Sequence, residues 1–194
     1  MTGDNADRLL AAELVAVVAR LRRATVEVRG RGRAAGSGSG VVWRPGLIVT
    51  NAHVATRGST LVETEDGSVR AARLVASDPR RDLAVLEVDT SGLAAADIAP
   101  AGTLRVGALV LAVGNPLGLS GAVTTGIVHA LSERHRRTPL ILADVRLLPG
   151  NSGGPLGDAT GRVVGVNTMI VRGLAAAIPS DVVDRFVRDA QLAA

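Results

Sequence analysis

The segment GNSGGPL at residues 150–156 surrounds a serine with glycines in a way that could serve nucleophilic chemistry. The glycines let the backbone bend sharply around Ser152, which exposes its hydroxyl and turns neighbouring amide N–H groups toward one point where an oxyanion could sit. The same letters also fit an ordinary glycine turn. A serine hydroxyl is a weak nucleophile at neutral pH, so it needs an imidazole to take its proton and a carboxylate to orient that imidazole.

Three histidines could supply the imidazole. His53 lies in TNAHV, residues 50–54, directly after an apolar strand pattern, where a polar turn can project it from a rigid support. His129 lies within an alternating strand pattern and His135 in a charged loop, so a sheet-face residue and a solvated loop residue are the favoured interpretations of these two. His53 is therefore the favoured candidate among the three.

Asp82 directly precedes LAVL at residues 83–86, a strand apolar enough to be buried. Its carboxylate could be shielded from water while facing a histidine, although an isolated aspartate at the start of a strand more often caps or forms a turn.

The serine segment also fits the nucleophile elbow of α/β-hydrolases. That fold requires a histidine after the serine, whereas all three histidines precede Ser152, so the order of the residues argues against the elbow.

The elements that must position these residues are mostly short strands. Val-rich runs punctuated by glycine and proline predict strands at 25–29, 39–43, 46–50, 60–64, 69–76, 83–88, 108–113, 122–130, 139–143 and 162–168. The stretch 90–107 is the predicted boundary between two β lobes. A terminal helix is predicted over about 180–192, with Ser180 as its N-cap.

The N-terminal residues 1–23 predict an amphipathic helix, because leucine and valine recur at steps of three and four with arginines in the last turn. We expect this helix to pack on its own domain, with a membrane-surface or assembly helix as the alternative. It does not read as a secretory signal, since acidic residues replace the positive start. With no recognisable export signal, the default expectation is a cytoplasmic location.

Composition excludes several classes of function. Trp43 and Phe186 are the only aromatic residues and the net charge is +4, so stacking on bases and arginine-driven binding of nucleic acid have little support. No apolar stretch is long enough for an integral membrane span. The absence of cysteine removes disulfides and cysteine-bound zinc. We expect no metal and no cofactor.

The ordered motifs TNAHV, DLAVL and GNSGGPL together resemble the protease domain of the HtrA (DegP-like) family of trypsin-like serine proteases. Supporting segments are GSGSG at 36–40, VGNPLGL at 113–119, TGIV at 125–128, GVNT at 165–168 and AIPS at 177–180. Taken without the resemblance, the glycine-rich segment at 36–40 indicates tight turning between strands. The resemblance covers about residues 24–192.

The resemblance implies an all-β, chymotrypsin-like double β-barrel with an N-terminal and a C-terminal helix. The trypsin-like protease domain would span 24–194, with barrel one at about 24–95, barrel two at about 101–178 and the active site in the cleft between them. His53, Asp82 and Ser152 would form the catalytic triad of a serine endopeptidase that hydrolyses unfolded or damaged proteins. Backbone N–H groups of Gly150 and Ser152, with Asn151, would form the oxyanion hole.

The resemblance also implies a substrate pocket lined by Arg146, Met169 and Ile170. If Arg146 turns outward, the pocket takes small or medium aliphatic residues; if it turns inward, its guanidinium could pair with an acidic substrate residue. Outward is favoured because burying an unpaired charge is costly.

Family members usually carry a PDZ domain, and we expect none here. Polypeptide substrates are the expected partners, and the oligomeric state is left open between monomer and trimer. The alternative to an enzyme is a catalytically silent scaffold or chaperone-like binder of the same fold.

Overall fold

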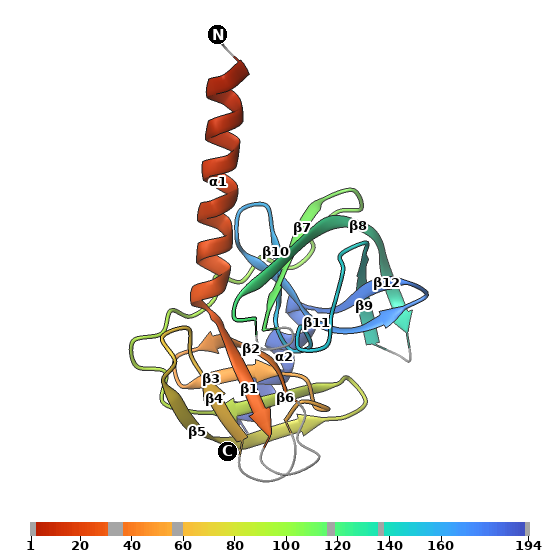
Figure 1. Ribbon diagram of the computed structural model, residues 1–194. Helices are drawn as coiled ribbons and strands as arrows, with labels where there is room; N and C mark the ends of the chain where they lie inside the picture. Colours follow the sequence, from red (N-terminus) through yellow and green to blue (C-terminus); the bar gives the residue numbers. More distant parts are fainter. Residues whose placement is uncertain (1–2, 31–36, 56–59, 116–118, 136–137, 193–194) are drawn as a thin grey trace.

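The strands of the computed structural model form two closed antiparallel β-barrels (Figure 1). The structure describes residues 3–30, 37–55, 60–115, 119–135 and 138–192. Residues 1–2 of the predicted N-terminal helix, Gly36, residues 116–118 and residues 193–194 lie outside this part of the chain. The all-β, two-barrel fold implied by the sequence motifs is confirmed.

Barrel one contains the first six strands: β1 (Thr25–Gly30), β2 (Ser37–Arg44), β3 (Leu47–Thr50), β4 (Thr60–Glu63), β5 (Val69–Asp78) and β6 (Leu83–Glu87). The strands follow one another around the barrel in the order β1-β2-β3-β6-β5-β4, and β1 closes it by pairing with both β2 and β4. This order places β3 directly beside β6. The strand that precedes His53 therefore lies next to the strand that follows Asp82.

Barrel two contains β7 (Leu109–Gly114), β8 (Ala122–His135), β9 (Thr138–Ala143), β10 (Pro155–Asp158), β11 (Val163–Val171) and β12 (Leu174–Pro179). Its order is β10-β11-β12-β9-β8-β7, closed by pairing of β10 with β7. Two of these strands, β10 and β12, are absent from the strands predicted by periodicity. β10 starts immediately after the glycines that follow Ser152, so the serine is attached to the wall of barrel two.

Three clusters of buried apolar residues hold the barrels together. One fills barrel one and includes Ile48 and Leu86; a second fills barrel two and includes Ile141 and Leu156. The third lies between the barrels and joins residues of both, such as Val49 of β3 and Val166 of β11. Because β3 has buried side chains on both of its faces, it takes part in two clusters at once. This shared apolar cluster fixes the position of one barrel against the other.

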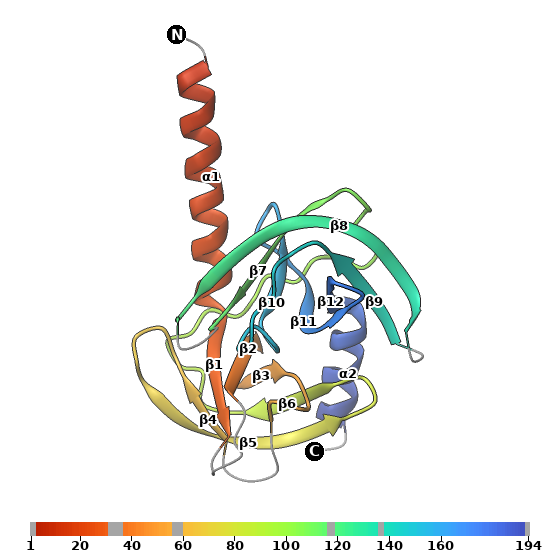
Figure 2. The same cartoon turned by 45° about the vertical axis from the view of Figure 1, so that its right-hand side comes forward.

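The C-terminal helix α2 (Ser180–Leu192) packs against both barrels. It lies against β6 of barrel one and against β11 and β12 of barrel two (Figure 2). Its buried face includes Phe186 and Val187, which belong to the cluster between the barrels. On barrel one, Trp43 Nε1 donates to Asp184 Oδ1 at 3.3 Å and Arg44 pairs with the same atom at 2.7 Å.

Among the side chains of the N-terminal helix α1 (Gly3–Arg23) that are described, those that pack on the domain lie in its last turns. Figure 1 shows the helix projecting away from the barrels, with its C-terminal end beside them. Val17 and Leu21 are buried there, whereas Leu9 and Val15 are 59% and 69% exposed. The expectation of a helix packed on its own domain therefore holds for its C-terminal turns alone. No helix among the described residues is long and apolar enough to cross a membrane.

Candidate active site

His53 and Asp82 form a close pair at the edge of barrel one. Nδ1 of His53 lies 2.9 Å from both carboxylate oxygens of Asp82, and the backbone N–H of His53 donates to Oδ1 at 3.2 Å. The pairing of β3 with β6 produces this contact, because Thr50 at the end of β3 lies opposite Ala84 at the start of β6. The antiparallel register thus brings together two residues that are 29 positions apart in sequence.

The backbone at Asp82 is held in a left-handed conformation. Its φ is +57°, a region that few residues other than glycine adopt and that asparagine and aspartate tolerate best. The fully buried Asn51 donates from Nδ2 to the Asp82 carbonyl at 2.9 Å, and the Thr168 hydroxyl donates to Asp82 Oδ2. Asn51 thus holds the backbone of Asp82, and Thr168 holds the carboxylate that faces His53.

Ser152 belongs to the segment that leads into β10 of barrel two, separated from that strand by Gly153 and Gly154, and its side chain is partly buried. Its hydroxyl donates to the Thr168 carbonyl at 3.2 Å. In the part of the chain that the structure describes, no hydrogen bond joins Ser152 to His53. Thr168 of β11 therefore links the serine to the Asp82 side of the site, with its carbonyl on Ser152 and its hydroxyl on Asp82.

Thr168 is a site residue that the motifs do not identify. It closes GVNT at residues 165–168, which the sequence offers only as a supporting segment. A threonine at the end of a Val-rich strand pattern reads as an ordinary β residue. It reaches Asp82, 86 positions away in sequence, only because the two barrels dock.

The backbone of the serine segment leaves two amide donors free. The N–H of Asn151 donates to the Leu148 carbonyl at 3.0 Å, and the N–H of Gly153 donates to the Asn167 carbonyl at 2.9 Å. By contrast, the N–H groups of Gly150 and Ser152 make no hydrogen bond with any described residue. The sequence assigned Gly150, Asn151 and Ser152 to the oxyanion hole. Of these three, Asn151 already uses its N–H on Leu148, whereas the N–H groups of Gly150 and Ser152 are available.

Gly153 allows the serine segment to approach barrel one. Its φ is +85°, and a Cβ atom there would lie 2.1 Å from the Ser39 carbonyl oxygen and 2.4 Å from Thr50 Oγ1. Neither neighbour is a flexible side-chain end, so an added methyl group must displace the segment itself. The close approach is possible only with glycine.

Gly153→Ala is therefore expected to lower both stability and activity. The matched control is Gly67→Ala, which has a similar φ of +81° but no atom within 4 Å of the added methyl group. Gly67→Ala should cost about 1–2 kcal/mol of unfolding free energy from the left-handed backbone alone, with full activity. Chemical denaturation and peptide hydrolysis measure both effects; equal losses of stability in the two variants would contradict this account.

The residues proposed for the pocket come from two parts of barrel two, the segment after β9 and the end of β11. Arg146 is exposed, and its carbonyl accepts a hydrogen bond from the Thr124 hydroxyl at 2.9 Å. Met169 and Ile170 follow Thr168 in β11 and are 37% and 61% exposed. The guanidinium of Arg146 pairs with no carboxylate among the residues described.

The other two histidines lie outside this arrangement. His129 belongs to β8, where its Nε2 is 3.3 Å from Asp144 Oδ2, and both side chains are about half exposed. This agrees with its interpretation as a sheet-face residue. His135 is the last residue of β8, and its side chain lies outside the described part of the chain.

The chain is similar to known proteases in sequence and in structure. Residues 38–166 match the model of the trypsin-like peptidase domain. A DegP-like periplasmic serine endoprotease of Halomonas elongata is 41% identical over 160 residues, covering 77% of this chain and 34% of that protein. The serine protease HhoB of Synechocystis sp. is 40% identical over 159 residues, covering 76% of this chain and 38% of that protein. This chain thus spans little more than a third of these relatives.

Solved structures agree with the sequence matches. The HtrA-type protease AlgW with a tripeptide has a TM-score of 0.84 and 34% identity, covering 90% of this chain and 62% of that one. A serine endoprotease from Yersinia pestis has a TM-score of 0.82 and 34% identity, covering 90% and 65%.

The relatives correct one expectation from the sequence. Proteins from Halomonas elongata, Pseudomonas savastanoi and Ectopseudomonas mendocina are named periplasmic serine endoproteases. The expected cytoplasmic location is contradicted by these names, which point outside the cytoplasm. That expectation rested on the lack of a recognisable export signal, and the lack of a signal in a chain that spans about a third of its relatives does not locate a protein.

Proposed function

The chain belongs to the trypsin-like peptidase family, with HtrA and DegP-like serine proteases as its homologues, and we propose from this premise that it cleaves polypeptides through Ser152, His53 and Asp82. The observation that carries the proposal is the His53–Asp82 pair, with Nδ1 2.9 Å from both carboxylate oxygens. A carboxylate in this place holds the proton on Nδ1 and leaves Nε2 free to accept one.

In the proposed reaction, Ser152 Oγ attacks the substrate carbonyl as its proton passes to His53 Nε2. The hydroxyl must first rotate away from the Thr168 carbonyl, which exchanges one hydrogen bond for another. The negative charge that develops on the substrate oxygen is stabilised by the N–H groups of Gly150 and Ser152. His53 then protonates the leaving amine, and water hydrolyses the acyl-enzyme by the same proton path.

We propose unfolded or damaged polypeptides as substrates, cleaved after small or medium aliphatic residues. The exposure of Arg146 supports this preference, because a guanidinium that stays in water does not offer its charge to the pocket. The names of the relatives support action outside the cytoplasm. The second candidate function is that of a catalytically silent scaffold. The hydrogen bond from Ser152 to the Thr168 carbonyl favours it, because the serine hydroxyl is then not hydrogen-bonded to His53.

Incubation with a denatured protein tests the proposal. We expect internal cuts whose fragments, read by mass spectrometry, end in valine, alanine, leucine or isoleucine. The same protein in its folded state should survive much longer. Intact denatured substrate after prolonged incubation would favour the scaffold, and fragments ending in aspartate or glutamate would mean that Arg146 turns into the pocket.

The pH dependence of hydrolysis should follow His53. The hydrogen bond to Asp82 raises the pKa of His53 above its ordinary value of 6.5, burial opposes this, and the negative charge of Asp82 adds to it. Only neutral His53 can act as a base, so kcat/KM should rise with pH and reach half its plateau above pH 6.5. A half-maximal point at or below pH 6.5 would contradict the pairing with Asp82.

Stability should show the opposite trend with pH. Because the folded protein raises the pKa of His53, the pair favours the folded state fully below the unfolded pKa of 6.5. This contribution is lost as the pH rises through the raised pKa. The protein should therefore gain activity over the same pH range in which His53 ceases to add to its stability.

A further inference from the structure

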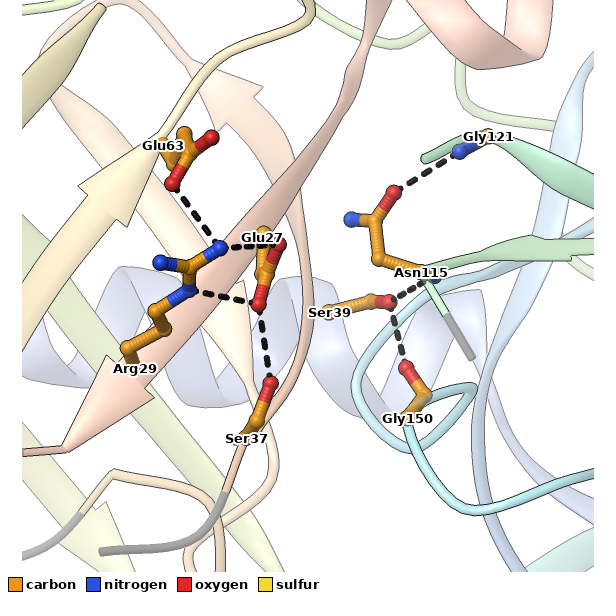
Figure 3. Close-up of polar contacts among 8 residues, drawn as sticks. All are labelled: Glu27, Arg29, Ser37, Ser39, Glu63, Asn115, Gly121 and Gly150. Atoms are coloured by element: carbon orange, nitrogen blue, oxygen red, sulfur yellow. Dashed lines mark hydrogen bonds and ion pairs between the residues drawn. The ribbon is translucent and has the colours of Figure 1, made fainter. Parts of the chain in front are cut away.

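Ser39 lies in β2 of barrel one, yet most of its polar contacts lead to barrel two. Its side chain is fully buried. The Ser39 N–H donates to the Ser152 carbonyl at 2.8 Å, and Oγ lies 2.7 Å from the Gly150 carbonyl oxygen and 2.9 Å from the Asn115 nitrogen. Figure 3 shows Oγ between Asn115 and Gly150. The Ser39 carbonyl accepts from Thr50 Oγ1 at 2.6 Å, just before the turn that carries His53.

The direction of each hydrogen bond at Ser39 Oγ is determined by its partners. The N–H of Asn115 can only donate, and the carbonyl of Gly150 can only accept, so the hydroxyl hydrogen must be directed at Gly150. Asn115 directly follows β7 and also accepts from the Gly121 N–H at 2.8 Å through its Oδ1. One hydroxyl thus connects the end of β7 to the serine segment, and both belong to barrel two.

These contacts fix the orientation of two peptide groups in the serine segment. The Gly150 carbonyl is bound by Ser39 Oγ, and the N–H of the same peptide group, on Asn151, is bound by Leu148. The Ser152 carbonyl is bound by the Ser39 N–H, and the N–H of that peptide group, on Gly153, is bound by Asn167. In each of these two peptide groups, both the carbonyl and the N–H are hydrogen-bonded, so neither group can rotate. The N–H groups of Gly150 and Ser152 belong to the peptide groups on either side and remain available to a substrate oxygen.

We propose that Ser39 is a positioning residue that sets the oxyanion-binding N–H groups from the opposite barrel, an inference that rests on the proposed protease function. Ser39 also contacts β3 through Thr50, and His53 lies three residues after that threonine. Ser39 thus contacts both the segment that carries the two N–H donors and the strand that leads to His53. It thereby fixes the position of the donors relative to the imidazole. Among the described residues, Ser39 makes no hydrogen bond with His53 or with the hydroxyl of Ser152, so it acts through the segment that it holds.

Ser37 provides a matched control in the same strand. Its hydroxyl donates to Glu27 Oε1 at 3.0 Å on the surface of barrel one, where Glu27 also binds Arg29 at 2.6 Å. Figure 3 shows this group of side chains apart from the Ser39 contacts. Ser37→Ala and Ser39→Ala delete the same atom from neighbouring positions on one face of β2. Only the second deletion removes a contact with the serine segment.

The test compares both variants with the wild type on a peptide substrate and on a peptide boronate, whose tetrahedral adduct places an oxygen in the oxyanion site. Losing one oxyanion donor lowers kcat by about 100- to 1,000-fold. In Ser39→Ala the N–H groups of Gly150 and Ser152 are still present but displaced, so kcat should fall by about 10- to 100-fold. KM should stay within about twofold, and boronate affinity should fall as kcat falls. Ser37→Ala should match the wild type in all three.

Titration with a fluorophosphonate separates this role from a merely structural one. Rates are expressed per reactive serine, so a fraction of unfolded protein lowers the number of sites without changing kcat per site. Wild-type kcat and boronate affinity per site in Ser39→Ala would overturn the inference while leaving the protease function intact. An inactive wild type would overturn the proposed function instead.

Ser39→Cys keeps the test decisive should the alanine variant fail to fold. The thiol fills the buried space but is a weak donor and acceptor, and the chain has no other cysteine. We expect a folded variant with kcat lowered at least tenfold at unchanged KM. A folded cysteine variant with the kcat of the wild type would contradict a positioning role for the hydroxyl.

Discussion

Ser152→Ala should reduce kcat for peptide hydrolysis by about six orders of magnitude, which is the loss measured when a serine nucleophile is removed from a triad. The reason is that the variant has no hydroxyl at this position to attack the substrate carbonyl and pass a proton to His53. The change deletes one hydroxyl whose hydrogen bond to the Thr168 carbonyl is 3.2 Å long, so the unfolding free energy should change by about 1 kcal/mol or less.

The measurement is hydrolysis of a denatured protein by equal amounts of the two proteins, with thermal unfolding to show that both are folded. Ser37→Ala is the matched control and should retain full activity, since its hydroxyl contacts Glu27 in barrel one. Turnover retained in a folded Ser152→Ala variant would remove Ser152 from the mechanism.

Asp82→Asn should lower kcat at neutral pH by about four orders of magnitude. Asparagine tolerates the φ of +57° at this position and can still accept from Thr168, so the backbone of the site should survive. Its amide can donate to His53 Nδ1, which favours the tautomer with the proton on Nε2. That nitrogen could then no longer take the proton of Ser152.

Asp89→Asn is the control, because Asp89 accepts from the Ser91 N–H at 2.9 Å in a surface turn beyond the far end of β6. It should match the wild type. Loss of the Asp82 charge should also bring the pKa of His53 down toward its ordinary value, since the bond to Asp82 is the main cause that raises it. A folded Asp82→Asn variant with more than about a tenth of wild-type kcat would contradict the assigned role.

His53, Asp82 and Ser152 stand out in the sequence because each lies in a motif whose residue types have a chemical reason to occur together. The structure pairs His53 with Asp82, and the catalytic role of the three residues stays a prediction. Two of the strands, β10 and β12, could not be predicted from the sequence pattern. β12 contains three successive alanines and β10 begins at Pro155 and includes Gly157, so both have low intrinsic β propensity. They are strands because neighbours on both sides supply hydrogen bonds, with β10 between β7 and β11 and β12 between β11 and β9.

The contacts made by Thr168 and Ser39 could not be predicted from spacing. Thr168 reaches Asp82 across 86 positions, and Ser39 reaches Gly150 across 111. Nothing local distinguishes either residue from a strand threonine or a serine in a glycine-rich turn. Their roles follow from the apolar cluster between the barrels, which brings the two ends of each contact together.

The N-terminal helix shows a related limit of periodicity. Its apolar pattern continues along most of the helix, but a pattern does not say how much of it finds a partner. Leu21 packs so closely against barrel two that a Cβ on Gly157 would lie 2.5 Å from its Cδ1, whereas Leu9 remains exposed. The prediction of an N-terminal helix is confirmed, and how far the helix packs depends on where the barrels end.

The most direct test of a proton path from Ser152 through His53 to Asp82 is labelling of the protein with a serine-directed fluorophosphonate, followed by mass spectrometry of the modified peptide. The account predicts one label, on Ser152, attached at a rate that rises with pH above 6.5 as His53 loses its proton and that falls steeply in Asp82→Asn. Absence of labelling in the folded wild-type protein, or labelling of a different serine, would contradict it.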